Sequence, residues 1–280
     1  MKQILRCVID SGGSVRLDDV PMPICNENEI LVSNKYSLIS IGTEIQMAKM
    51  DTVGAVSTTL KDDSLKNTVF NMFKSMKLID FFRLVKEELQ KGYPMGYSGA
   101  GEVIEIGNQV SGVNVGDRVA YAGSGHADFV KVPQNLFVKL PNEVRYSEGA
   151  FVTLGSIAMQ GIRQGNLGLG ETVVVYGLGL VGLLTTQILN AYGFKVIGID
   201  IEDEKLQSAK NFGAENCYNS NIDKNIITEN ILKYTDGHGV DCAIICAANM
   251  KDSKIVNHAA ELCRRKGRIV IVGKVGLDLE

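Results

Sequence analysis

The stretch ETVVVYGLGLVGLLTTQILNAYGFKVIGID, residues 171–200, combines two short apolar runs with one longer amphipathic run between them. The first run, Thr172–Tyr176, is rich in β-branched residues and too short for a helix, which predicts a buried parallel strand. Apolar residues then recur at helical spacing until Gly193. Lys195–Ile199 is typical of a second strand, and Asp200 ends it. The stretch therefore predicts a strand, a helix and a second parallel strand.

Three glycines, Gly177, Gly179 and Gly182, lie in the turn between the first strand and the helix. In the G-x-G-x-x-G pattern the first glycine permits the tight turn, the second leaves room for a pyrophosphate, and the third lets the helix pack on the strand. The start of the helix offers free N–H groups and a positive dipole end to phosphates. Asp200, about 20 residues further on, would bind the adenosine ribose and repel a 2′-phosphate. We predict a site for NAD, with NADP less favoured; the alternative is a glycine-rich turn without a ligand.

Composition and charge narrow the class of protein. The chain has 280 residues, enough for two domains, with 45% hydrophobic and 22% charged residues and a net charge of −3. These values predict a globular protein without a nucleic-acid or membrane partner. No apolar run approaches about 18 residues and no signal peptide is evident, which favours the cytoplasm. The six cysteines have no CxxC spacing and the three histidines are scattered, which argues against a disulfide framework or a ligand cluster.

The pattern of the chain changes near residue 146. Closely spaced strand patterns with glycine-rich turns fill 1–146 and predict a small barrel. Residues 60–91 contain no glycine and repeat apolar residues at helical spacing, which predicts a helical insert. The insert either covers its own core or forms a lid or a docking face. Ser147 is the expected N-cap of a helix running to Gln164, and alternating strands and helices over 147–280 predict a doubly wound sheet of five strands.

These motifs together resemble the medium-chain dehydrogenase/reductase superfamily, which includes zinc-type alcohol dehydrogenases and quinone reductases. The residues that carry the resemblance are Gly42-Thr43-Glu44, GYSGAGEVIEIG from Gly96, VGDRVA from Val115, GLGLVG from Gly177 and GRIVIVG from Gly267. The insert and the GYSGAG run are more similar to one branch, the dehydrogenase half of two-domain bacterial oxidoreductases.

This resemblance implies an α/β protein of two domains. The first is a chaperonin-10-like β-barrel catalytic domain over 1–146 with a helical insert at about 60–91. The second is a doubly wound Rossmann NAD-binding domain over 147–280, incomplete because it lacks the last strand. We accordingly expect a C-terminally truncated chain with apolar surface at the open edge of its sheet.

The resemblance also assigns roles to single residues. Thr43 matches a hydroxyl that relays the substrate proton, and Tyr97 occupies the place of a metal-binding histidine, from which its phenol could assist hydride transfer. The alternatives are a turn hydroxyl bonded to its own backbone for Thr43 and a packed aromatic ring for Tyr97. Weaker candidates at the cleft are Tyr36, Tyr121 and His126. The implied cofactor-binding residues are Gly177, Gly179, Val181 behind the nicotinamide, Gly182, and Asp200 and Lys205 at the ribose.

The resemblance does not extend to the residues that bind zinc in the superfamily. Where the family places three ligands for a catalytic zinc, this sequence has Ile41, Tyr97 and Thr153. Isoleucine offers no donor atom, and the lobe with four close cysteines that holds a structural zinc is missing. We therefore predict no metal site.

Two functions remain open at this point. The first is a zinc-independent, nicotinamide-dependent oxidoreductase of the alcohol dehydrogenase type. It would move hydride to or from a carbonyl or alcohol, such as a sugar or polyol, or an activated alkene. The second is a nucleotide-binding module with little activity of its own that docks on a partner domain. The expected partners are a small-molecule substrate and either a second oxidoreductase domain or further copies of the chain.

Overall fold

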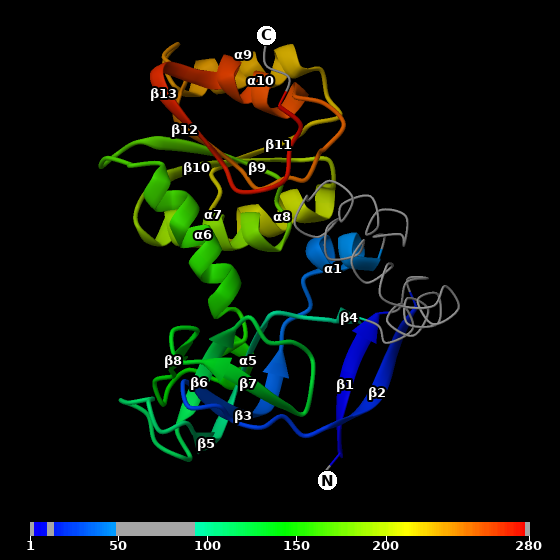
Figure 1. Cartoon of the computed structure of the whole chain (residues 1–280). Coiled ribbons are helices and arrows are strands. Elements are labelled where there is room, and N and C mark those ends of the chain that lie inside the picture. Colours follow the sequence, from blue (N-terminus) through cyan, green and yellow to red (C-terminus); the bar gives the residue numbers. More distant parts are fainter. Residues whose placement is uncertain (1–2, 10–13, 49–92, 278–280) are drawn as a thin grey trace, which may run out of the picture. The chain divides into compact units, whose positions relative to one another are not determined.

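The computed structural model describes residues 3–9, 14–48 and 93–277, with only the backbone for 45–48 and Tyr93 (Figure 1). The chain divides into two compact units, Met1–Thr153 and Leu154–Glu280. The helical insert expected at about 60–91 lies outside the described residues.

The described part of the first unit is built mainly from antiparallel strands. Its strands are β1 (Gln3–Ile9), β2 (Val15–Pro21), β3 (Glu29–Ser37), β4 (Tyr93–Pro94), β5 (Ser98–Ile106), β6 (Arg118–Ala122), β7 (Phe129–Pro133) and β8 (Phe137–Lys139), and its helices are α1 (Ile41–Ala48) and α5 (Tyr146–Gly149). The strands form one sheet of order β2-β1-β4 and another of order β7-β3-β5-β6-β8. An isolated antiparallel bridge links Arg6 of β1 to Ala127, which lies two residues before β7.

Alternating residues of the second sheet, with Val113 from the connection between β5 and β6, form the core of this unit. The buried members are Ile30, Val32, Val103, Val113, Val119, Tyr121, Val130 and Val132. The prediction that Tyr121 borders a cleft is wrong, because its side chain is 1% exposed and packs in this core. The ring fits because position 99 is a glycine, where a β-carbon would collide with the Tyr121 hydroxyl.

The second unit is a parallel sheet with helices on both faces. Its elements are α6 (Val152–Gln164), β9 (Thr172–Tyr176), α7 (Leu180–Ala191), β10 (Lys195–Asp200), α8 (Asp203–Asn211), β11 (Asn216–Asn219), α9 (Lys224–Tyr234), β12 (Val240–Ile245), α10 (Lys254–Leu262) and β13 (Cys263–Ile271). The strand order is β11-β10-β9-β12-β13, with every pair parallel. The five-stranded sheet predicted from the sequence is confirmed.

Each face of this sheet has its own core, because the central strands are apolar on both sides. One cluster packs β9, β10 and β12 against α9 and α10, with Ile227, Ile231 and Leu262 from the helices. The other packs the opposite side chains of the same strands against α6, α7 and α8, with Leu189 and Leu206 among them. Figure 1 shows α9 and α10 on one side of the sheet and α7 and α8 on the other.

Two element boundaries differ from the expected ones. The helix expected from Ser147 to Gln164 is divided into α5 and α6, with Arg145 rather than Ser147 as the N-cap. The interruption is stabilised by the Ser98 hydroxyl, which donates to the carbonyl of Ala150 at 2.6 Å. Near the C-terminus, the sequence predicts a helix from Ser253 to Arg265 and a strand from Arg268. In the structure α10 ends at Leu262, and β13 begins at Cys263 with an irregular register against β12.

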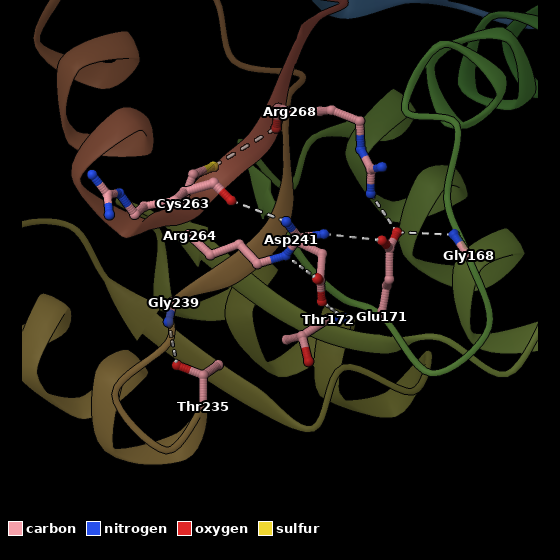
Figure 2. A network of polar contacts seen from close by, with 10 residues as sticks. Gly168, Glu171, Thr172, Thr235, Gly239, Asp241, Cys263, Arg264 and Arg268 are labelled. Carbon is pink, nitrogen blue, oxygen red and sulfur yellow. Dashed lines mark hydrogen bonds and ion pairs between the residues drawn. The ribbon is translucent and has the colours of Figure 1, made fainter.

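A network of charged side chains ties together the amino ends of β9, β12 and β13 (Figure 2). Arg264 Nε donates to Asp241 at 2.5 Å, and Arg268 forms an ion pair with Glu171. Both carboxylates also accept backbone N–H groups, that of Thr172 for Asp241 and that of Gly168 for Glu171, at 2.7 and 2.9 Å. Because the strands are parallel, this network lies at the edge of the sheet opposite to their carboxyl ends.

Candidate functional site

The carboxyl ends of β9 and β12 flank the point where the strand order reverses. β10 and β11 extend the sheet on one side of β9, and β12 and β13 on the other. Ligands of open α/β sheets bind in the crevice at such a reversal. The loop of Gly177–Gly182 leaves β9 at this point, as the βαβ pattern predicted.

The three glycines of this loop meet three different steric demands. Gly177 has a φ of +80°, and a β-carbon there would lie 2.6 Å from the backbone of Ala247. A β-carbon on Gly182 would collide with the carbonyl oxygen of Gly177. Around Gly179, by contrast, a β-carbon would meet no heavy atom within 4 Å. The first and third glycines are therefore required by the fold. The space at Gly179 is not filled by the protein and is open to a bound ligand.

Gly179 is also the N-cap of α7 and provides no side-chain cap. The first turn of this helix contains no acidic residue, so its dipole end is not neutralised from within the helix. An open backbone position at an uncapped helix start fits a diphosphate.

Asp200 connects the end of β10 to the glycine loop. Its Oδ2 accepts the N–H of Leu178 at 2.6 Å, and its Oδ1 accepts the N–H of Glu202 at 3.1 Å. The residue is 8% exposed, so both oxygens are held in place by backbone donors. A carboxylate fixed beside the loop fits a role in binding a ribose hydroxyl.

The other two predicted cofactor residues lie close in sequence to these. Val181 is a half-buried residue in the first turn of α7. Lys205 in α8 forms an ion pair with Glu202, Nζ to Oε1 at 2.7 Å. Glu202 was not singled out from the sequence, although its position two residues after Asp200 is a usable signal. The cofactor roles of all these residues remain predictions.

A buried pair lies directly before the glycine loop. The hydroxyl of Tyr176 lies 2.7 Å from Nδ1 of His258, and Nε2 of His258 lies 3.2 Å from the hydroxyl of Thr228. Because the Thr228 hydroxyl donates to the carbonyl of Lys224, it accepts from Nε2, and Nδ1 accepts from the phenol. Burial lowers the pKa of His258, which favours this neutral ring.

In the first unit, Thr43 lies in α1. The helix begins at Ile41, and its start is closed by Glu44, whose Oε1 accepts the N–H of Ser40 at 2.8 Å. The exposed Thr43 receives a hydrogen bond from the Ser40 hydroxyl at 3.4 Å. Glu44 is only 4% exposed, so the residue next to Thr43 is anchored in the unit.

Tyr97 is half-buried and follows Gly96, whose φ is +86°. The ring of His126 covers Gly96 so closely that a β-carbon there would lie 2.7 Å from it. His126 also lies 3.3 Å from Glu44, Nε2 to Oε2. One side chain thus contacts the neighbours of both predicted catalytic residues. From the sequence, His126 is only a weaker candidate, because nothing local links it to residues so distant in the chain.

The comparisons with known proteins agree with this geometry. Residues 181–280 match a family described as zinc-binding dehydrogenase. Sorbitol dehydrogenase 1 of Saccharomyces cerevisiae is 33% identical over 188 residues, covering 55% of this chain and 53% of that protein. The crystal structure of 2R,3R-butanediol dehydrogenase from Bacillus subtilis has a TM-score of 0.75 at 20% identity, covering 99% of this chain and 79% of the other. That of Escherichia coli quinone oxidoreductase, complexed with NADPH, has a TM-score of 0.72 at 19% identity, covering 99% and 76%.

The chain is similar to zinc-binding dehydrogenases and to sorbitol and butanediol dehydrogenases. The resemblance inferred from the sequence motifs and the predicted α/β fold are thereby confirmed. The chain spans about half the length of the curated relatives it matches. Among the described residues, no helix combines the length and the apolar character needed to cross a bilayer.

The residues at the superfamily's zinc positions do not fit a metal ion. Ile41 is 67% exposed and has no donor atom, and the hydroxyl of Thr153 donates to the carbonyl of Tyr121 at 3.3 Å. Within residues 3–9, 14–48 and 93–277, no group of three or more histidine, cysteine, aspartate or glutamate residues could hold a metal. All six cysteines and all three histidines fall within these ranges. The independence of the protein from zinc remains a prediction.

Proposed function

We propose that this chain is a nicotinamide-dependent oxidoreductase that moves hydride between NAD(H) and an alcohol or carbonyl without zinc. The observation that carries the proposal is the loop at the strand-order reversal, where Gly179 is open and Asp200 is fixed beside it. Bound nicotinamide would supply or accept the hydride. The chain itself would hold the diphosphate at the start of α7 and the ribose at Asp200.

The proposed substrates are sugars, polyols or vicinal diols. Support comes from the names of the relatives, which are sorbitol and butanediol dehydrogenases. In this proposal Tyr97 donates a hydrogen bond to the substrate oxygen and stabilises the negative charge that develops there. Thr43 accepts or returns the proton of the same oxygen through its hydroxyl.

NAD is the proposed coenzyme rather than NADP. A 2′-phosphate at the ribose would approach the carboxylates of Asp200 and Glu202, and the cation of Lys205 is already paired with Glu202. Repulsion between the phosphate and these carboxylates would disfavour the phosphorylated coenzyme. We further propose a cytoplasmic protein that works with a second oxidoreductase domain or as a homo-oligomer.

The test is a calorimetric titration of the protein with NADH and with NADPH, with metal analysis of the same sample. We expect tighter binding of NADH and no stoichiometric zinc. Gly179→Val should abolish binding without unfolding the protein, because position 179 is open and its φ of −69° suits any residue. Gly155→Ala is the matched control, since that position in α6 is equally open and distant in sequence from the loop. Full NADH affinity in Gly179→Val would refute the site.

The second candidate is a nucleotide-binding module that docks on a partner domain. It is favoured by β13, an edge strand on which Ile269 and Ile271 are 37% and 42% exposed. The two candidates differ in turnover. If the wild-type protein binds NADH but oxidises neither sorbitol nor 2,3-butanediol, or if Tyr97→Phe and Thr43→Val leave turnover unaltered, the binding module is the better description.

A further inference from the structure

A hydrogen-bonded row of three side chains in the second unit joins α9 and α10 to the end of β9, and the function described so far does not use it. The Tyr176 hydroxyl lies 2.7 Å from Nδ1 of His258, and Nε2 of the same ring lies 3.2 Å from the Thr228 hydroxyl. The rings of Tyr176 and His258 meet edge to face, with centroids 5.8 Å apart. Tyr176 is 4% and His258 9% exposed, so water has little access to these bonds.

The hydrogen-bond partners fix the place of the protons in this row. The Thr228 hydroxyl donates to the carbonyl of Lys224 at 2.9 Å and therefore accepts from Nε2 of His258. Nδ1 of the ring then carries a lone pair and accepts from the Tyr176 phenol. Burial raises the pKa of this phenol above its ordinary value of 10.0, so the phenol keeps the proton that it donates. The row is complete only while the ring of His258 is neutral.

The row lies where two segments meet beside the glycine loop. Tyr176 is the last residue of β9, and Gly177 follows it directly. In the segment between β12 and α10, Cys246 donates its N–H to the carbonyl of Tyr176 at 2.7 Å. The next residue, Ala247, lies so close to Gly177 that a β-carbon there would be 2.6 Å from its backbone. Because this segment leads into α10, the bond from His258 to Tyr176 joins the same two parts of the chain a second time.

We propose that His258 is a positioning residue for the coenzyme: its neutral ring holds Tyr176 at the end of β9, and a proton on Nδ1 weakens coenzyme binding. This inference rests on the function proposed above. A protonated ring donates at both nitrogens, so the Tyr176 oxygen would have to accept at Nδ1, and the proton of the phenol would lose its buried acceptor. The end of β9 would then shift, and the N–H groups of the glycine loop would meet the diphosphate less well.

The proposal makes proton binding at His258 and coenzyme binding oppose each other. If the proton lowers coenzyme affinity by a given factor, bound coenzyme lowers the proton affinity of the ring by the same factor. Burial lowers the pKa of His258 below its ordinary value of 6.5. The Kd of the coenzyme should therefore rise as the pH falls through this lowered pKa, and the ring should not affect the pH dependence of Kd at higher pH, where it is neutral.

The charged groups that act on His258 come from its own helix and from α9. Glu261 in α10 raises the pKa of the ring and Lys224 in α9 lowers it, and the two are paired with each other, Nζ to Oε1 at 2.9 Å. In β13, burial raises the pKa of the Cys263 thiol to about 11, so this neighbour of Tyr176 carries no charge near neutrality. β10 and β12 contribute apolar side chains to the same core.

The first experiment measures the Kd of NADH, by the fluorescence of the coenzyme, in steps from about pH 8 down to about pH 5.5. Tyr176→Phe keeps the ring and removes the hydroxyl, so Kd at about pH 8 should rise by about fivefold or more. His258→Gln should remove the rise of Kd in acid, because an amide does not titrate there. The matched control is Tyr234→Phe, which removes a tyrosine hydrogen bond to Glu215 at the amino end of the sheet and should leave Kd unchanged.

The second experiment follows the imidazole of His258 in the wild-type protein. Long-range ¹H–¹⁵N spectra, assigned with His258→Gln, should show the proton of the neutral ring on Nε2. The pKa of the ring with saturating NADH should lie below that of the free protein, by about one pH unit for each tenfold effect of the proton on Kd. A side chain that only stabilises the fold would not produce this agreement. The wild-type measurement stands even if Tyr176→Phe lowers stability.

The outcomes separate the positioning role from the proposed function. Equal NADH affinity of Tyr176→Phe and the wild-type protein at about pH 8, or a His258 pKa that is the same with and without NADH, would overturn the role and leave the oxidoreductase intact. A wild-type protein that binds no NADH at any pH would overturn both.

Discussion

Asp200 accepts the backbone N–H of Leu178 at 2.6 Å, and this bond joins the end of β10 to the glycine loop after β9. The same carboxylate accepts the N–H of Glu202, so one side chain shapes both segments that would surround a ribose. The proposed coenzyme contact and the local fold therefore depend on the same two oxygens.

We expect Asp200→Asn to weaken both the binding of the coenzyme and the stability of the fold. An amide has one acceptor in place of two and directs N–H groups at a backbone donor, so the unfolding free energy should fall by about 1–2 kcal/mol. NADH affinity should fall about tenfold, and NADPH affinity should fall less because one negative charge is removed. Urea unfolding and fluorescence titration measure the two effects. Asp19→Asn, the same change at an exposed position of β2, should alter neither.

The glycines of the loop should separate into structural and functional classes. Gly182→Ala places a β-carbon against the carbonyl oxygen of Gly177, and neither backbone can move freely, so we expect a loss of about 2 kcal/mol in unfolding free energy. Gly179→Ala should change it by less than about 0.5 kcal/mol, because nothing lies near that position. Equal stability of the two variants in urea would contradict this division.

The contrast between these glycines and His126 shows what sequence could reveal. Gly177, Gly179 and Gly182 follow a strand and open a helix, so their geometry depends on neighbours within a few residues and could be predicted. His126 meets Ser37 and Glu44 across 89 and 82 residues, respectively. No periodicity specifies which loops of a barrel meet, since that depends on strand order and register. The division between α5 and α6 could not be predicted for the same reason. The contact that stabilises it comes from Ser98, which is distant in the sequence.

The network of Figure 2 predicts a stability effect at low pH. The hydrogen bond from Arg268 lowers the pKa of Glu171 below its ordinary value of 4.5, despite partial burial. Folding therefore favours the charged form, and the stabilisation is complete above about pH 4.5 and is lost as the pH falls through the lower, folded-state pKa. Glu171→Gln should lower the unfolding free energy by about 1–3 kcal/mol at pH 7 and reduce its decline in acid. Glu229→Gln, an exposed change in α9, is the control for denaturation at each pH.

His258 should make the unfolding free energy depend on pH in a range closer to neutrality than Glu171 does. Burial lowers its pKa in the folded protein below the ordinary 6.5, although nearby Glu261 acts against this. Between the two values the unfolded chain binds the additional proton, so the unfolding free energy should fall as the pH drops below about 6.5 and level off below the folded-state pKa. The physical cause is burial, which removes water from the ring and disfavours its charged form. His258→Gln should remove this slope in urea unfolding between about pH 5 and 8. His238→Gln, at an exposed histidine, should keep it, and an identical slope in both variants would show that the buried pair is not its source.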